Sequence, residues 1–210
     1  MNRLIVIAIV FLFAGQVTHS QIPTVSVGGI PIALPAPDGF FRYDGKSVKV
    51  DRFEQSFLDK NGRFLAMFGS EEVLADVLSE HIPKPGRRFS AQADTNLEVL
   101  AITPTYFAEL KPEIRKSFAT NPEILSEAVK ELESGAASAL PQFGILGKLK
   151  IGELISLGVF DETKESLCFS FLAKAKISEK AGSNITITTN CVVNVKEKLI
   201  FLVADRKSVV

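Results

Sequence analysis

The chain has 210 residues, with 24 Lys and Arg against 24 Asp and Glu, so it carries no formal net charge at pH 7. Nucleic acids and anionic membrane surfaces select a basic excess in their partners, and this balance excludes both as the main partner. The length fits one domain that is large enough to bury a core, in which the 16 Phe residues are the main aromatic filler.

Residues 1–20 have the pattern of a signal peptide. Arg3 supplies the positive start, residues 4–14 form an apolar run, and small residues precede Gln21. A permanent membrane anchor is the weaker alternative, because the run is shorter than the roughly 20 residues that span a bilayer. We therefore expect export to the periplasm or the medium, no stable membrane span after cleavage, and a single globular domain over residues 21–210.

The first half of the mature chain predicts short strands and helices in alternation. The segment 25–34 reads as strand, interrupted at Gly28 and Gly29, and Pro-rich residues 35–39 read as a turn. A short helix is expected with Asp51 as its cap and with its end at Asn61 and Gly62. A strand over 63–69 and a helix over 71–78 with Ser70 as its cap follow.

The middle of the chain predicts two strands and two helices. The strands are expected over 89–93 and 99–102. A helix that starts at Pro104 continues in spacing to Phe118, with a kink or a break expected at Pro112. The next helix has Asn121 as its cap and Gly135 as its end.

Two strands over 168–177 and 184–195 alternate in polarity and predict a hairpin that turns near residues 180–182. The odd-numbered residues of both segments are mainly apolar. If both odd-numbered faces point into the core, cross-strand partners share parity, both odd or both even.

This parity bears on the two cysteines. Export favours a Cys168 to Cys191 disulfide, but one number is even and the other odd, so the expected register places the two side chains on opposite faces. We therefore predict no disulfide and two structural thiols. A reactive thiol is the alternative, and it needs an electropositive setting that the neighbouring residues do not offer.

The segment 199–204 is apolar at both parities, which is typical of a strand covered on both faces. Together these elements predict an α+β fold: a mainly antiparallel sheet with helices on both faces, a three-layer α/β/α sandwich.

Four stretches resemble a group of uncharacterised exported bacterial proteins: the leader, PIALPAPDGF at 31–40, LGVFDETKESLCFSFL at 157–172 and VNVKEKLIFLVA at 193–204. The general plan of these proteins is similar to the PsbP-like α/β/α sandwich of the photosystem II extrinsic subunit. In such proteins a helix that covers the sheet follows the last strand, so the resemblance implies that this chain, which ends at Val210, is truncated.

The sequence offers no catalytic, metal or cofactor site. His81 is the one histidine after the leader and lacks ligands or a nucleophile at suitable spacing. The pair Glu71 and Glu72 is explained by a helix start, and the pair Asp161 and Glu162 by an exposed turn.

One small basic loop, formed by Lys84, Arg87 and Arg88, is a candidate site for an anion or a lipid head group, and a solvated corner is the structural alternative. The first functional hypothesis is a non-enzymatic envelope protein that binds an unknown partner or supports an assembly. The second is a carrier of a small apolar ligand or lipid, with a Phe-lined pocket between sheet and helices and the basic loop at its mouth. A hydrolase is the third.

Overall fold

The computed structural model describes residues 22–83, 86–120, 122–176 and 184–208. It shows an α+β fold around a seven-stranded antiparallel sheet in the order β3-β4-β5-β9-β8-β7-β6, with β1 and β2 paired separately. The strands are β1 Thr24–Val27, β2 Ile30–Ala33, β3 Phe41–Arg42, β4 Gly62–Gly69, β5 Arg88–Asp94, β6 Lys150–Glu162, β7 Ser166–Lys176, β8 Asn184–Val195 and β9 Lys198–Ser208. The helices are α1 Val48–Gln55, α2 Glu71–Leu78, α3 Pro104–Thr120, α4 Pro122–Ala139 and the short 3-10 helix η1 Leu140–Phe143. The predicted α+β class with a mainly antiparallel sheet is confirmed.

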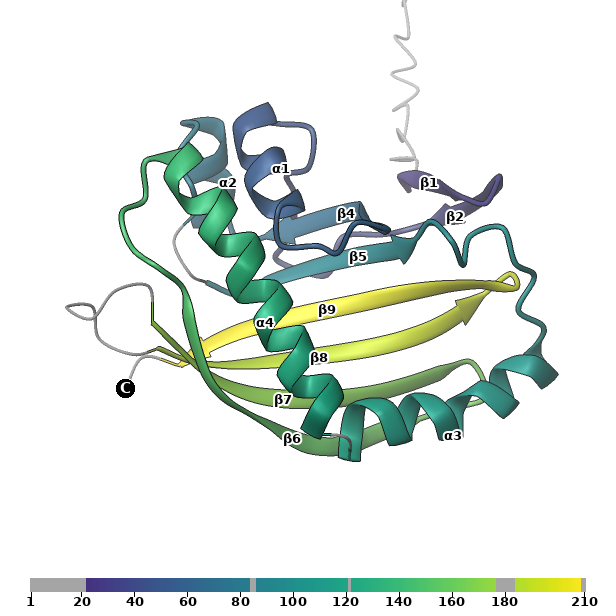
Figure 1. Ribbon diagram of the computed structural model, residues 1–210. Helices are drawn as coiled ribbons and strands as arrows, with labels where there is room; N and C mark the ends of the chain where they lie inside the picture. The colour runs from purple at the N-terminus through teal and green to yellow at the C-terminus, as the bar shows by residue number, and fades with distance from the viewer. Residues whose placement is uncertain (1–21, 84–85, 121, 177–183, 209–210) are drawn as a thin grey trace, which may run out of the picture.

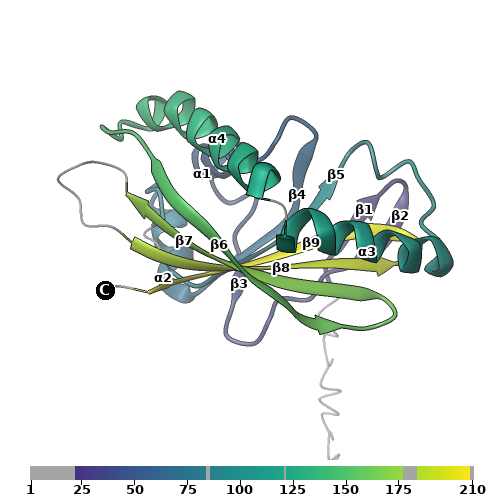
Figure 2. The same ribbon diagram turned by 60° about the horizontal axis from the view of Figure 1, so that its bottom comes forward.

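The two faces of the sheet are covered differently. We call the face that carries Ser90 of β5 and Val203 of β9 the helix face; there α4 crosses the long strands diagonally, with α3 beside its lower end (Figure 1). We call the other face the hairpin face, because Val27 and Ile32 of the β1–β2 hairpin pack there against Ala91 and its neighbours. Figure 2 shows α4 and the hairpin on opposite sides of the twisted sheet. A helical layer on the hairpin face, which the three-layer prediction required, is not confirmed.

The β1–β2 hairpin turns where the two glycines predicted it. Gly28 and Gly29 have φ angles of 54° and 81°, a left-handed backbone that glycine adopts without strain. The Gly28 amide also donates to the Glu98 carboxylate at 3.0 Å, which ties the turn to the segment after β5.

Helix α1 begins three residues before the predicted Asp51. Ser47 is its cap, and the Ser47 hydroxyl accepts from the Val50 amide at 3.4 Å. Asp51 instead accepts from the Gly45 amide at 3.0 Å, so its carboxylate closes the loop before the helix. The prediction of Asp51 as the cap was wrong because Ser47 offers an earlier cap.

Helix α4 continues past Gly135, where the sequence predicted its end. A Cβ at this position would lie 2.9 Å from the backbone oxygen of Ser56, at the end of α1. The glycine therefore serves the close approach of two helices. The structure also shows α3 as one helix through Pro112, and no strand over 99–102, where Ile102 donates a single backbone bond to Glu197.

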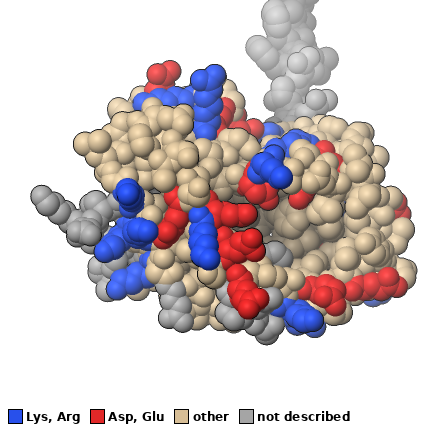
Figure 3. Space-filling view, in the orientation of Figure 1, with Lys and Arg blue, Asp and Glu red and all other residues tan. Residues whose placement is uncertain are grey.

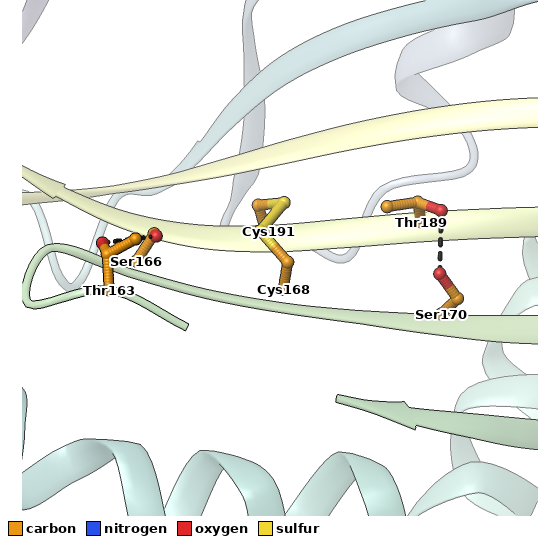
Figure 4. The surroundings of a disulfide bond; sticks show 6 residues. All are labelled: Thr163, Ser166, Cys168, Ser170, Thr189 and Cys191. Atoms are coloured by element: carbon orange, nitrogen blue, oxygen red, sulfur yellow. Dashed lines mark hydrogen bonds between the residues drawn. A yellow bond between two sulfur atoms is a disulfide. The ribbon is translucent and has the colours of Figure 1, made fainter. Parts of the chain in front are cut away.

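The register of β7 and β8 corrects the cysteine prediction. The strands are antiparallel neighbours as expected, but each pair joins an even-numbered residue to an odd-numbered one, as Leu172 opposite Ile187 shows. Cys168 therefore lies directly opposite Cys191, and the two are joined by a disulfide (Figure 4). The prediction failed because the residues that face the helices are odd-numbered in β7 and even-numbered in β8. Phe169 and Phe171 of β7 pack with Val192 of β8.

Strand β6 forms one edge of the sheet and is irregular. Its pairing with β7 shifts register at three places, and three of its large apolar side chains are exposed: Ile155, Leu157 and Phe160. Next to it in the sheet, the first half of β7 is buried at successive positions. No described helix of the chain is both long and apolar enough to cross a membrane. The predicted leader, the Asn121 cap and the turn at 180–182 lie outside the described residues.

Candidate functional site

A mainly apolar cavity lies on the helix face, between the sheet and the helices α1 and α4. Its volume is about 730 Å³. Strands β4, β5, β8 and β9 supply its floor, and α1, the second half of α4 and the segment after η1 supply its walls.

Most of the described lining is apolar. The side chains of this kind are Phe53, Phe57, Leu58, Phe64, Met67, Ile82, Leu132, Ala136, Leu140, Ile145, Leu149 and Val203. Phe53 makes edge-to-face contacts with Phe57 and with Phe143, both with ring centroids 5.0 Å apart. Phe53 lies in α1 and Phe57 in the turn that directly follows it, so that the two rings, four residues apart, come to one side of the chain.

A polar cluster forms one end of the cavity. We call it the Arg88 cluster, and it consists of Tyr43, Glu54, Arg88, Thr188 and Asp205. Arg88 Nη1 donates to Glu54 Oε1 at 2.5 Å, and the Tyr43 side chain is hydrogen-bonded to Arg88. Thr188 Oγ1 donates to Asp205 Oδ1 at 2.8 Å, and Asp205 lies opposite Arg88 in the β5–β9 register. The cluster therefore joins three strands to α1.

Burial shapes the ionisation of the Arg88 cluster. Burial raises the pKa of the Tyr43 hydroxyl and, as the largest of several causes, the pKa of the Glu54 carboxyl. The pKa of Arg88 is also raised, because the attraction of Glu54, Tyr43 and Asp205 outweighs the opposing effect of burial. Arg88 Nε is buried and has no hydrogen-bond partner in the described structure, so one donor of the guanidinium remains open to an acceptor.

The structure does not bring the predicted basic loop together. Arg88 lines the cavity, but its neighbour Arg87 is exposed and lies over the Phe40 ring, 5.9 Å from its centroid. Phe40 packs in the core of the hairpin face, and successive residues of an extended chain point to opposite faces. Lys84 lies outside the described residues. Of the three predicted anion-site residues, the described structure therefore separates Arg87 from Arg88 and pairs Arg88 with the Glu54 carboxylate.

The remaining candidate groups are accounted for by other contacts. His81 is exposed beyond the end of α2, where its amide donates to the Asp76 carbonyl at 2.9 Å. Glu162 ends strand β6 instead of lying in a turn, and it forms ion pairs with Lys111 and Arg115 of α3. Both cysteines are oxidised, so neither is a thiol nucleophile. Among the described residues, no group of three His, Cys, Asp or Glu is placed to hold a metal ion.

Four members of the Arg88 cluster were missed from the sequence. Asp205 carries a sequence signal, because it continues the alternation of Phe201 and Val203 on the helix face of β9. Glu54 carries no such signal, since its neighbour Phe53 is the residue that marks the buried side of α1. Tyr43 and Thr188 look like ordinary loop and strand residues until tertiary structure places them.

Acidic side chains also gather outside the cavity. In Figure 3 they lie over α4, next to a hollow in the surface. The exposed positions of α4 include Glu123, Glu127 and Glu131, which follow one another at four-residue intervals, and one lysine, Lys130. This side of the molecule is therefore mainly acidic around the helix that walls the cavity.

A comparison with known protein families, curated proteins and solved structures finds no match to this chain.

Proposed function

We propose that the protein is a non-enzymatic binding protein that holds a small, mainly apolar ligand in the cavity of the helix face. The observation that carries the proposal is a space of about 730 Å³ with an apolar lining and one polar end. Specific sites for small molecules commonly combine these features, because apolar walls supply affinity and a few polar groups fix orientation. The hydrolase alternative gains no support, because the described lining contains neither His nor Cys.

We further propose that the protein works outside the cytoplasm, in the periplasm or the medium. The disulfide between Cys168 and Cys191 supports this, since such bonds persist in oxidising compartments. We also propose a likeness to a PsbP-like domain, limited to the antiparallel sheet and the helices on its helix face.

Binding of a neutral fluorescent probe tests the ligand proposal. N-phenyl-1-naphthylamine fluoresces in apolar surroundings, and we expect saturable binding together with a rise in melting temperature as the bound state is favoured. Ser90→Phe adds a ring inside the cavity, because Ser90 lines its floor. We expect this variant to lose probe affinity by about tenfold or more, since a filled site excludes the probe.

The matched control is Ser134→Phe, the same substitution at an exposed position of α4 that does not line the cavity. It should bind the probe as the unmodified protein does. Absence of saturable binding, or equal binding by the Ser90→Phe variant with its fold intact by circular dichroism, would overturn the proposal.

Binding of a partner protein is a second candidate, and it is favoured by the exposed apolar side chains of strand β6. Leu157 and Phe160 are 53% and 61% exposed on the edge of the sheet. Exposed apolar groups at an edge are typical of interaction sites. A pull-down from the envelope fraction tests this candidate, with the unmodified protein and a Leu157→Asp, Phe160→Asp variant used in parallel. A partner that binds both proteins equally would contradict a role for this edge.

A further inference from the structure

The charges at the polar end of the cavity do not balance. Among the described lining residues the charged ones are Glu54, Arg88 and Asp205, two carboxylates against one guanidinium. Tyr43 adds no charge at neutral pH, because the ordinary pKa of a tyrosine hydroxyl is about 10 and burial raises it further. The polar end therefore carries a formal excess of one negative charge next to an apolar space, where an uncompensated charge is costly.

The shortage of positive charge falls on Asp205. Among the described residues, the Arg88 guanidinium donates to Glu54 at 2.5 Å, whereas Asp205 accepts from a neutral donor, the Thr188 hydroxyl at 2.8 Å. The charge of Asp205 also raises the pKa of Glu54, after burial and against the opposing effect of Arg88. A second cation near Glu54 and Asp205 would offset the repulsion between their negative charges.

We propose that the ligand of this cavity is an amphipathic molecule whose head group is a protonated amine, held by the carboxylate of Asp205 with its chain among the phenylalanines. This inference rests on the proposed function and names the chemical class of the ligand for the same cavity. An ammonium group donates hydrogen bonds and brings the missing positive charge, and charge-assisted hydrogen bonds are stronger than neutral ones.

An anionic head group is the competing possibility, because Arg88 Nε is buried without a partner and could donate to a ligand oxygen. A carboxylate placed there would bring a third negative charge to a single guanidinium. A hydroxyl next to the amine would accept from Nε without that cost. The exposed glutamates of α4 act in the same direction, since an acidic surface attracts cations and repels anions on the way to the cavity.

The test is competition against bound N-phenyl-1-naphthylamine by dodecylamine, dodecanol and dodecanoate, three probes with one chain length and different head groups. At neutral pH and below their micelle concentrations, we expect dodecylamine to displace the dye at about a tenfold lower concentration than dodecanol, with dodecanoate weakest. Failure of the dye to bind at all would contradict the proposed function. Displacement by dodecanoate as good as or better than by dodecylamine would contradict the amine alone and leave the proposed function standing.

Two variants assign the preference to its residue. Asp205→Asn removes the charge and should bring dodecylamine to the level of dodecanol in the same variant. Thr188→Val removes the hydroxyl next to the same carboxylate and should keep the preference for the amine. A preference that survives in Asp205→Asn would overturn the role of this residue.

Discussion

Arg88 of β5 donates to Glu54 of α1 at 2.5 Å, while Asp205 of β9 lies opposite Arg88 in the sheet. The pair connects the sheet to a helix at the polar end of the cavity. The two partners are not equivalent, because the arginine has a second carboxylate nearby and Glu54 depends on the arginine.

Removal of Arg88 should cost more stability than removal of the Glu54 charge. Arg88→Met leaves two carboxylates without their cation, and we expect the free energy of unfolding to fall by about 3 kcal/mol. Glu54→Gln leaves Arg88 with Asp205 and should lower it by about 1 kcal/mol. Urea denaturation of both variants measures the difference, and equal losses would contradict this account of the cluster.

The raised pKa of Glu54 should appear in the pH dependence of stability. Burial raises this pKa above its ordinary 4.5, so the folded protein holds the proton more tightly than the unfolded chain. The stability from this proton is complete below pH 4.5 and is lost as pH rises through the folded pKa. Relative to Glu54→Gln, the unmodified protein should therefore lose free energy of unfolding as pH rises above this value.

Subtraction of the Glu54→Gln curve serves as the control, since burial also raises the pKa of Asp51, which both proteins share. A difference that grows in favour of the unmodified protein above pH 4.5 would instead mean that Arg88 keeps Glu54 ionised.

The disulfide should stabilise the second half of the sheet. Cys168 and Cys191 are 23 positions apart, and a cross-link of this span contributes about 3 kcal/mol, largely through the unfolded chain. A reductant should lower the free energy of unfolding by this amount and should have no effect on a Cys168→Ala, Cys191→Ala variant. Two reactive thiols in the native, unreduced protein would contradict the bond.

The two glycines of the β1–β2 turn should respond differently to alanine. Both have left-handed backbone, so each substitution costs about 1 kcal/mol in strain. At Gly28 the added Cβ would also lie 2.0 Å from the backbone oxygen of Glu98, whereas at Gly29 no atom lies within 4 Å. Thermal unfolding should therefore show a clearly larger loss for Gly28→Ala, and equal losses would mean that the turn does not press on the Glu98 segment.

Local sequence patterns predicted the elements that depend on local chemistry. The glycine turn after β1, strand β4 and helix α2 follow from residues within a few positions of each other. The predictions failed where contacts with a segment distant in the sequence determine a helix end or a strand register. Gly135 looks like a helix end until the backbone of Ser56 is placed beside it, and the cysteine register depends on which face of β8 meets the helices.

The candidate site was predictable in kind and not in detail. Its Phe-rich wall follows from the spacing of Phe53 and Phe57, and Arg88 was named as a binding residue. The sequence could not show that Arg87 and Arg88 separate across the sheet, because no pattern fixes where strand β5 begins. Nor could it show that Glu54 and Asp205, far apart in the chain, meet at one arginine.

The irregular edge at β6 has a consequence for how copies of this protein behave at high concentration. A regular, apolar edge strand can pair with the edge strand of another molecule and extend the sheet, which is the first step toward fibrils. In β6 the three register shifts interrupt the regular backbone that such pairing needs. Ile155, Leu157 and Phe160 can therefore be exposed without promoting aggregation through this edge. Substitutions that remove these register shifts would leave β6 as a regular apolar edge strand, and we expect them to promote aggregation.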